Sequence, residues 1–163
     1  MAKAKEEKTN VMRILEQKQI SYTAHTYEHE EGVAVDGVTV AAQLGQDPEQ
    51  VFKTLVARGA SKSIYVFCIP VAENLDLKKA ARAVGEKAIE MVAVKEINAL
   101  TGYIRGGCSP VGMKKQYPTV FHETAEIVDT IIVSAGKIGY QVELAPIDLV
   151  ELVGGTLSDI TVV

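Results

Sequence analysis

The stretch from Gly102 to Lys115 constrains this chain more than any other, because it reads GYIRGGCSPVGMKK within an otherwise apolar sequence. Glycine clusters where the backbone takes positive φ or approaches another group closely, and proline fixes φ and removes one donor. We therefore expect a loop of definite shape whose free N–H groups can face a carbonyl, an oxyanion or a phosphate. A P-loop is not expected, because the lysine-serine ending is missing. The alternative is a plain glycine-rich turn between strands.

Composition favours one globular domain over residues 1–163, with residues 1–8 frayed. Apolar residues make up 47% of the chain and charged residues 23%, which is enough to bury a core. The net charge of −4 argues against a DNA-binding or membrane-surface protein, so any RNA contact needs a local basic patch. Cys68 and Cys108 form no C-x-x-C pattern, so we expect no metal, other cofactor or disulfide. No leader-like or membrane-spanning run is recognised, and we expect a cytoplasmic location.

Hydrophobic periodicity predicts an α+β domain rather than a doubly wound one. Helices are expected over 9–18, 40–44, 77–84, 94–100 and 146–153, with Thr39 as the N-cap of the second. A turn or helical piece is expected over 123–127. β-Branched and aromatic residues predict strands over 20–27, 51–58, 63–70, 89–93, 119–122, two within 130–144, and a last one over 160–163. Residues 51–70 are expected to form a hairpin.

One residue of the strand expected over 51–58 does not fit its apolar setting. Alternation places Lys53 between Val51 and Leu55 on a face that looks buried. An ammonium there is costly unless it is paired or lines a polar cavity, which makes Lys53 a candidate functional residue. The alternative is a lysine near a strand end whose ammonium reaches water.

His25 and His29, with neighbouring carboxylates, raise the question of a zinc site. On a strand, residues four apart are separated by about 13 Å, which is too far for one ion. We therefore expect no metal at this segment and interpret it as the solvated end of an edge strand.

A hydrolytic triad is not predicted either. No G-x-S-x-G motif occurs, and no histidine adjoins a nucleophile in the sequence. Loop N–H groups and Arg105 could lower the pKa of Cys108 and make it reactive, but a tolerated small loop residue is the favoured interpretation. Cys68 is expected to be a core residue. A lysine, a tyrosine-bearing strand and two glycine loops position and polarise a carbonyl better than they activate water.

Several motifs in order give the chain a family resemblance. The motifs are HTYEH at 25–29, VFKTL at 51–55, TGY at 101–103, GGCSPVGMKK at 106–115 and VSAGK at 133–137. With these motifs the chain resembles the YbaK/EbsC family of aminoacyl-tRNA deacylases, relatives of the editing domain inserted in bacterial prolyl-tRNA synthetases.

The resemblance implies a strongly twisted, barrel-like mixed sheet flanked by helices, and a free-standing protein that removes a wrong amino acid from tRNA. Its typical substrate would be Cys-tRNA(Pro), with Cys-tRNA(Cys) as another, while sister branches clear alanine or other small residues. The substrate's own thiol would attack the ester carbonyl and leave as a thiolactone, although attack by water stays open. The reaction would then be lyase-like rather than hydrolytic.

The resemblance also assigns roles to residues. Lys53 matches the essential lysine, which would bind the terminal phosphate or ribose or assist the oxyanion. Gly106 and Gly107 belong to the loop that holds the carbonyl. The expected substrate-binding residues are Tyr27, Thr54, Ser109, Pro110, Ser134 and Gly136. Residues 32–38 are expected to help select the amino acid.

Contacts with the tRNA acceptor end would come from cations that bind phosphates, a role that carries little sequence information. The candidates are Lys78, Lys79, Arg82, Lys114 and Lys115. The net negative charge predicts weak affinity for tRNA alone and so favours action in a complex, with prolyl-tRNA synthetase as the expected partner. Two competing interpretations are a non-catalytic module that binds aminoacyl ends or a small ligand and, ranked last, a cell-surface regulatory role.

Overall fold

The computed structural model describes residues 8–30 and 32–162, so the expected fraying at the N-terminus lies, except for Lys8, outside the described residues. The helices are α1 (Asn10–Gln17), α2 (Gly37–Leu44), α3 (Leu77–Val84), α4 (Val94–Thr101), the 3-10 helix η1 (Glu123–Glu126) and α5 (Pro146–Leu152). The strands are β1 (Tyr22–Thr26), β2 (Phe52–Gly59), β3 (Ile64–Pro70), β4 (Ile89–Met91), β5 (Thr119–His122), β6 (Ile131–Ser134), β7 (Tyr140–Leu144) and β8 (Thr156–Ser158). No helix in this part of the chain has the length and apolarity needed to cross a bilayer.

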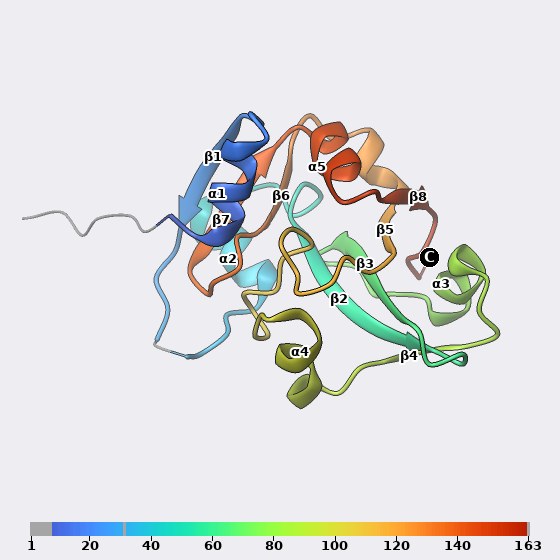
Figure 1. Cartoon of the computed structure of the whole chain (residues 1–163). Coiled ribbons are helices and arrows are strands. Elements are labelled where there is room, and N and C mark those ends of the chain that lie inside the picture. The colour runs from blue at the N-terminus through green and yellow to red at the C-terminus, as the bar shows by residue number, and fades with distance from the viewer. Residues whose placement is uncertain (1–7, 31, 163) are drawn as a thin grey trace, which may run out of the picture.

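The strands form two sheets that meet at one corner (Figure 1). An antiparallel sheet has the order β1-β7-β6, and a mixed sheet has the order β4-β2-β3-β5-β8, in which β3, β5 and β8 run parallel. A single parallel bridge between Val51 and Ile132 joins the start of β2 to β6. The expected α+β domain with a twisted mixed sheet is confirmed. The described strands do not close into a barrel, because only this one bridge joins the two sheets.

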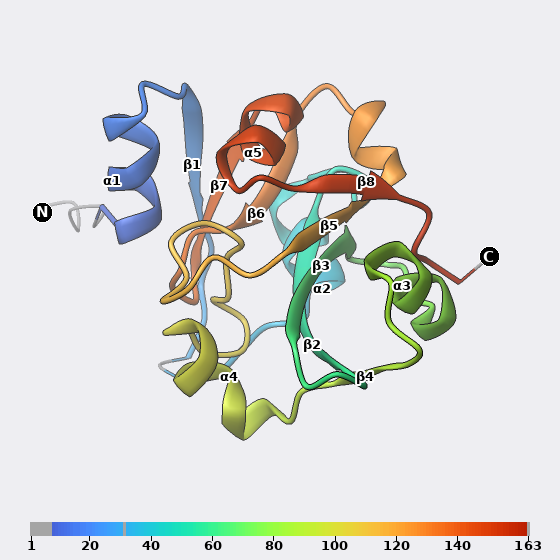
Figure 2. The ribbon, with the colours of Figure 1, turned by 45° about the vertical axis from the view of Figure 1, so that its right-hand side comes forward.

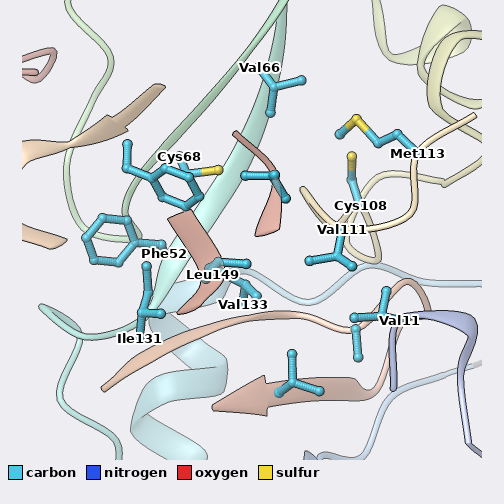
Figure 3. Packing of buried hydrophobic residues seen from close by; sticks show 14 of the residues in the cluster. Val11, Phe52, Val66, Cys68, Cys108, Val111, Met113, Ile131, Val133 and Leu149 are labelled. Atoms are coloured by element: carbon cyan, nitrogen blue, oxygen red, sulfur yellow. The ribbon is translucent and has the colours of Figure 1, made fainter. Parts of the chain in front are cut away.

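Alternation along β2 and β3 divides the core between the two faces of the mixed sheet. Phe52 and Cys68 belong to the larger cluster, which the antiparallel sheet, α1, α5 and the 102–114 loop complete. Figure 3 shows part of this cluster, with Phe52 and Cys68 at one end and Cys108 at the other. The opposite face packs against α3, which lies far from α1 (Figure 2). The interpretation of Cys68 as a core residue is confirmed.

Two predicted boundaries are wrong, and local hydrogen bonds explain both. The N-cap of α2 is Asp36 rather than Thr39, because the Asp36 carboxylate accepts both the N–H and the hydroxyl of Thr39 and starts the helix three residues earlier. The last described strand is β8, and residues 160–162 form only a single antiparallel bridge, between Thr161 and Leu75, while Val163 of the predicted strand lies outside the described residues. Ile160 donates its N–H to Nδ1 of His122 instead of to a strand.

Candidate functional site

A pocket of about 550 Å³ opens near the corner where the two sheets meet. Its walls come from the end of β1, the segment leading into α2, the start of β2, and the loops that follow α4 and β3. The polar side chains and loop residues of its lining include Tyr27, Lys53, Thr54, Gly106, Ser134 and Gln141. The pocket is therefore built from parts of the chain that are far apart in sequence.

Residues 34–37 form one wall, which the sequence singled out as a selector of the amino acid. Small residues let this wall approach its neighbours. A Cβ on Gly37 would lie 2.7 Å from the side chain of Val71, and a Cβ on Gly106 would lie 2.7 Å from that of Ala34. The wall is thus fixed against the rest of the pocket at both ends.

Lys53 is the half-buried cation of the pocket. Burial lowers its pKa, whereas the charges of Asp36 and Glu73 act in the opposite direction. Within residues 8–30 and 32–162 its ammonium has no hydrogen bond and no carboxylate within 4.0 Å. The ammonium is therefore available to a ligand.

Tyr103 holds the glycine loop in place. Its hydroxyl donates a 2.6 Å hydrogen bond to the carbonyl of Val111, and its N–H donates to Oγ1 of Thr101. Gly112 and Gly136 have φ of +77° and +89°, and a Cβ on Gly112 would lie 2.8 Å from the Tyr103 hydroxyl oxygen, whereas one on Gly136 would lie 2.9 Å from a ring carbon of Tyr103. The expectation of a loop of definite shape is confirmed.

The loop has two unpaired backbone donors at residues that line the pocket. The N–H groups of Gly106 and Cys108 have no hydrogen-bond partner in the described parts of the chain, and both residues line the pocket. The N–H of Gly107 is occupied, because it donates to the carbonyl of Ile104 at 3.0 Å. Ser134 supports the loop from β6 by donating its hydroxyl to the carbonyl of Gly106 at 3.3 Å.

Cys108 is not an activated thiol. Burial raises its pKa to about 11, and a hydrogen bond with Thr101 offsets only part of this effect. The idea that the loop or Arg105 lowers this pKa is wrong, because removal from water outweighs the neighbouring donors. The interpretation of Cys108 as a small packed residue holds.

The sequence did not single out Gln141, a buried polar residue of the pocket. Its Oε1 accepts a 2.8 Å hydrogen bond from Nε2 of Gln46, while its own Nε2 has no partner among the described residues. Oε1 of Gln46 is buried without a partner as well. Alternation along β7 makes Gln141 look like an ordinary solvent-facing position, so the sequence carried no signal for it.

The structure brings only part of the predicted site together. Tyr27, Lys53, Thr54, Gly106 and Ser134 line the pocket. Of the other predicted residues, Gly107 packs on the backbone of Lys137 and Ile138, Gly136 packs on Tyr103, and Ser109 is fully buried and bonds the N–H of Val111. These three and Pro110 do not line the pocket.

The predicted tRNA-contacting cations also lie outside the pocket lining. Lys78, Lys79 and Arg82 belong to α3, where the Lys79 ammonium is engaged by Asp159 and by the carbonyl of Thr161. Lys115 stacks on the ring of Tyr117.

The histidine segment considered for a metal is used otherwise. His25 Nε2 lies 2.6 Å from Oε1 of Glu143. Within the described ranges, no group of three or more His, Cys, Asp or Glu side chains is arranged to hold a metal ion.

Comparison with known proteins places the chain among editing domains. The family model described as "Aminoacyl-tRNA editing domain" matches residues 32–152. A protein of Enterococcus faecalis (strain ATCC 700802 / V583), named provisionally as the Cys-tRNA(Pro)/Cys-tRNA(Cys) deacylase EbsC, is 46% identical over 162 residues, covering 99% of this chain and 98% of that one.

Two crystal structures share the fold. One, of a protein provisionally described as a trans-editing enzyme for prolyl-tRNA synthetase, has a TM-score of 0.78 and 24% identity, covering 94% of this chain and 95% of that one. The other, of the hypothetical protein APE2540, has a TM-score of 0.82 and 21% identity, covering 93% and 99%. These two likenesses show the fold. Because the family model matches residues 32–152 and the Enterococcus faecalis relative is 46% identical over nearly the whole chain, the chain belongs to the aminoacyl-tRNA editing domain family.

Proposed function

We propose that this protein is a trans-editing deacylase that cleaves the ester bond of mischarged aminoacyl-tRNA, with Cys-tRNA(Pro) as its main substrate and Cys-tRNA(Cys) as another. The observation that carries the proposal is a pocket with a cation and free backbone donors but no activated nucleophile. Among the residues that the structure describes, its lining contains no histidine, and the thiol of Cys108 has a pKa raised to about 11. Such a site suits a substrate that brings its own nucleophile.

In the proposed reaction the sulfur of the substrate cysteine attacks the ester carbonyl carbon. A C–S bond forms, the C–O bond to the ribose oxygen breaks, and the thiol proton ends on that oxygen, so the products are a thiolactone and tRNA with a free hydroxyl. In this proposal the N–H groups of Gly106 and Cys108 would donate to the developing oxyanion, because both are unpaired among the described residues and both residues line the pocket. Lys53 would add positive charge, and Tyr27, Thr54 and Ser134 would keep the ester oriented.

The roles of the remaining predicted residues are supporting ones in this proposal. Gly107 and Gly136 allow close packing around the loop, and Ser109 and Pro110 hold its shape. Ala34, Val35 and Val40 belong to the apolar part of the lining, which favours a small, weakly polar side chain such as that of cysteine.

The test is deacylation of cysteinyl-, alanyl- and prolyl-tRNA(Pro) by the wild type, Lys53→Ala and the surface control Lys87→Ala, with products identified by mass. We expect rapid release of the thiolactone by the wild type and the control and a loss of at least tenfold in Lys53→Ala. S-methylcysteinyl-tRNA(Pro), which has no thiol proton to lose, should resist cleavage. Release of free cysteine and cleavage of the S-methyl substrate would indicate attack by water. Release of alanine instead would move the protein to a sister branch, and binding without release would favour a sequestering module.

Partnership with prolyl-tRNA synthetase and action in the cytoplasm, where tRNA is charged, belong to the same proposal. The net charge of −4 supports weak affinity for tRNA alone. Affinity for tRNA(Pro) should therefore rise when the synthetase is added, and an unchanged affinity would remove this part of the proposal.

A further inference from the structure

Arg105 is a second cation of the pocket, and the proposed reaction does not use it. It is exposed while lining the pocket, so it lies where the pocket meets solvent. In the described parts of the chain its guanidinium has no carboxylate within 4.0 Å and no hydrogen-bond partner. A free guanidinium at the rim of a pocket can bind an anionic group of a ligand that stays outside the pocket while the rest of the ligand lies inside.

The backbone around Arg105 is fixed. Ile104 accepts the N–H of Gly107 across the turn that contains Arg105. Gly106, the next residue, is held by Ser134 and packs against Ala34. The side chain therefore starts from a defined position, which lowers the entropy cost of placing its planar fork on a ligand.

The charges of the pocket favour an anion at this place. The described lining residues include the cations Lys53 and Arg105 and one carboxylate, Asp36, which is already engaged as the N-cap of α2. Lys53 is half-buried inside the pocket, whereas Arg105 is at the rim. An elongated ligand with a polar ester inside and an anionic group outside matches this order.

We propose that Arg105 binds the phosphodiester group on the 5′ side of the terminal aminoacyl-adenosine, while that nucleoside and its amino acid occupy the pocket. The inference rests on the proposed function and adds to it a phosphate subsite at the pocket rim. In this arrangement Lys53 interacts with the ester and Arg105 binds the phosphate. It also places the first phosphate contact nearer the reaction than the cations of α3, which do not line the pocket.

The test compares two substrates that differ in the phosphate. Cysteinyl-tRNA(Pro) carries it, and 2′(3′)-O-cysteinyl-adenosine does not. Arg105→Ala should lower kcat/KM for the tRNA about tenfold and change that for the nucleoside less than twofold. The slope of log(kcat/KM) for the tRNA against log salt should become shallower by about 0.7, the value for one contact to a single strand. Arg105→Lys should recover part of the loss, because charge is kept and the fork is lost.

Arg13→Ala, on the exposed face of α1, is the matched control and should leave both substrates unchanged. Equal losses on the two substrates would overturn the proposal and make Arg105 a residue that shapes the pocket. No loss on either would overturn it too.

A binding experiment separates this proposal from the deacylase assignment. Wild type should bind 5′-AMP more tightly than adenosine, and Arg105→Ala should remove that difference. If the wild type cleaves no aminoacyl ester, the proposed function fails, yet the comparison of AMP with adenosine still decides whether Arg105 binds the phosphate. Equal affinity of the wild type for the two compounds would overturn the subsite.

Discussion

Gly106 touches Ala34 so closely that a methyl group on Gly106 would lie 2.7 Å from the Ala34 Cβ and 3.2 Å from its Cα. This contact joins the glycine loop to the wall formed by residues 34–37, although the two segments are about seventy residues apart in the sequence. Only a glycine at 106 permits the approach, and its φ of +89° favours glycine as well. The distance between these two segments is therefore set by the absence of a side chain at Gly106.

Gly106→Ala should therefore cost more than the strain of placing alanine at positive φ, because the added methyl group would also push the loop away from Ala34 and change the shape of the pocket. Gly85→Ala is the matched control, because its φ is +73° and nothing lies within 4 Å of an added Cβ. The control should lose about 1 kcal/mol in the free energy of unfolding and keep its activity. Gly106→Ala should lose more stability and at least tenfold in kcat/KM, measured by urea unfolding and deacylation. Equal stability losses in the two variants would show that the Ala34 contact yields without cost.

Local signals were enough for most of the elements. Asp76 caps α3 and Gly85 ends it in the left-handed conformation, and both residues are readable from the sequence. The start of α2 was missed because Asp36 and Thr39, which lie three positions apart, can both cap a helix. Only the structure shows that the Asp36 carboxylate accepts hydrogen bonds from the N–H and the hydroxyl of Thr39.

From the residues alone, two parts of the candidate site could be predicted: Lys53, because it is a cation in an apolar strand, and the glycine loop that contains Gly106 and Arg105. Tyr27, Thr54 and Ser134 were predicted only through the family resemblance. Gln141 was not predicted, because a glutamine on an alternating strand is ordinary when its neighbours are unknown. Long-range folding, which brings Gln46 of the α2 region against β7, is what gives Gln141 its role.

The two cysteines should be unreactive in the folded protein. Burial raises the pKa of Cys108 to about 11 and that of Cys68 to about 12, so both thiols stay protonated at neutral pH. A thiol reagent such as dithionitrobenzoate should modify neither cysteine before unfolding and both in denaturant. Fast modification of the native protein at pH 7.5 would contradict the burial of these thiols.

The raised pKa of Cys108 also predicts alkaline sensitivity. Below the ordinary thiol value of 9.0 the group is protonated in both states, so its contribution to stability is complete. Between pH 9 and about 11 the unfolded chain releases the proton while the folded chain keeps it, so stability falls as pH rises. The urea midpoint should therefore drop less between pH 8 and pH 10 in Cys108→Ala than in the wild type. An equal drop would assign the alkaline loss to other groups.

The Gln46–Gln141 pair should matter for activity. Gln141→Leu removes the amide that faces the pocket and should lower kcat/KM about tenfold. Gln46→Leu should act through Gln141, because the Gln46 side chain now orients the Gln141 amide and the substitution would leave that amide free to turn. It should change KM more than the turnover rate. Gln50→Leu is the control: its amide bonds Thr130 and does not line the pocket, so it should cost stability and leave kcat/KM unchanged. A normal kcat/KM in Gln141→Leu would exclude the amide from substrate binding.

Removing the charge of Lys53 should lower activity and raise the stability of the fold. Burial lowers its pKa, so the folded chain holds this proton less tightly than the unfolded chain does. Stability should therefore rise with pH as Lys53 loses its charge in the folded state, up to the ordinary lysine value of 10.5. Lys53→Met keeps the length of the side chain without the charge, so it should unfold at a higher temperature than the wild type at pH 7 while losing activity. The difference in melting temperature should shrink toward pH 10.5, whereas Lys87→Met at an exposed position should show no such trend. A lower melting temperature for Lys53→Met at pH 7 would mean that the ammonium stabilises the fold and is not held there for its function.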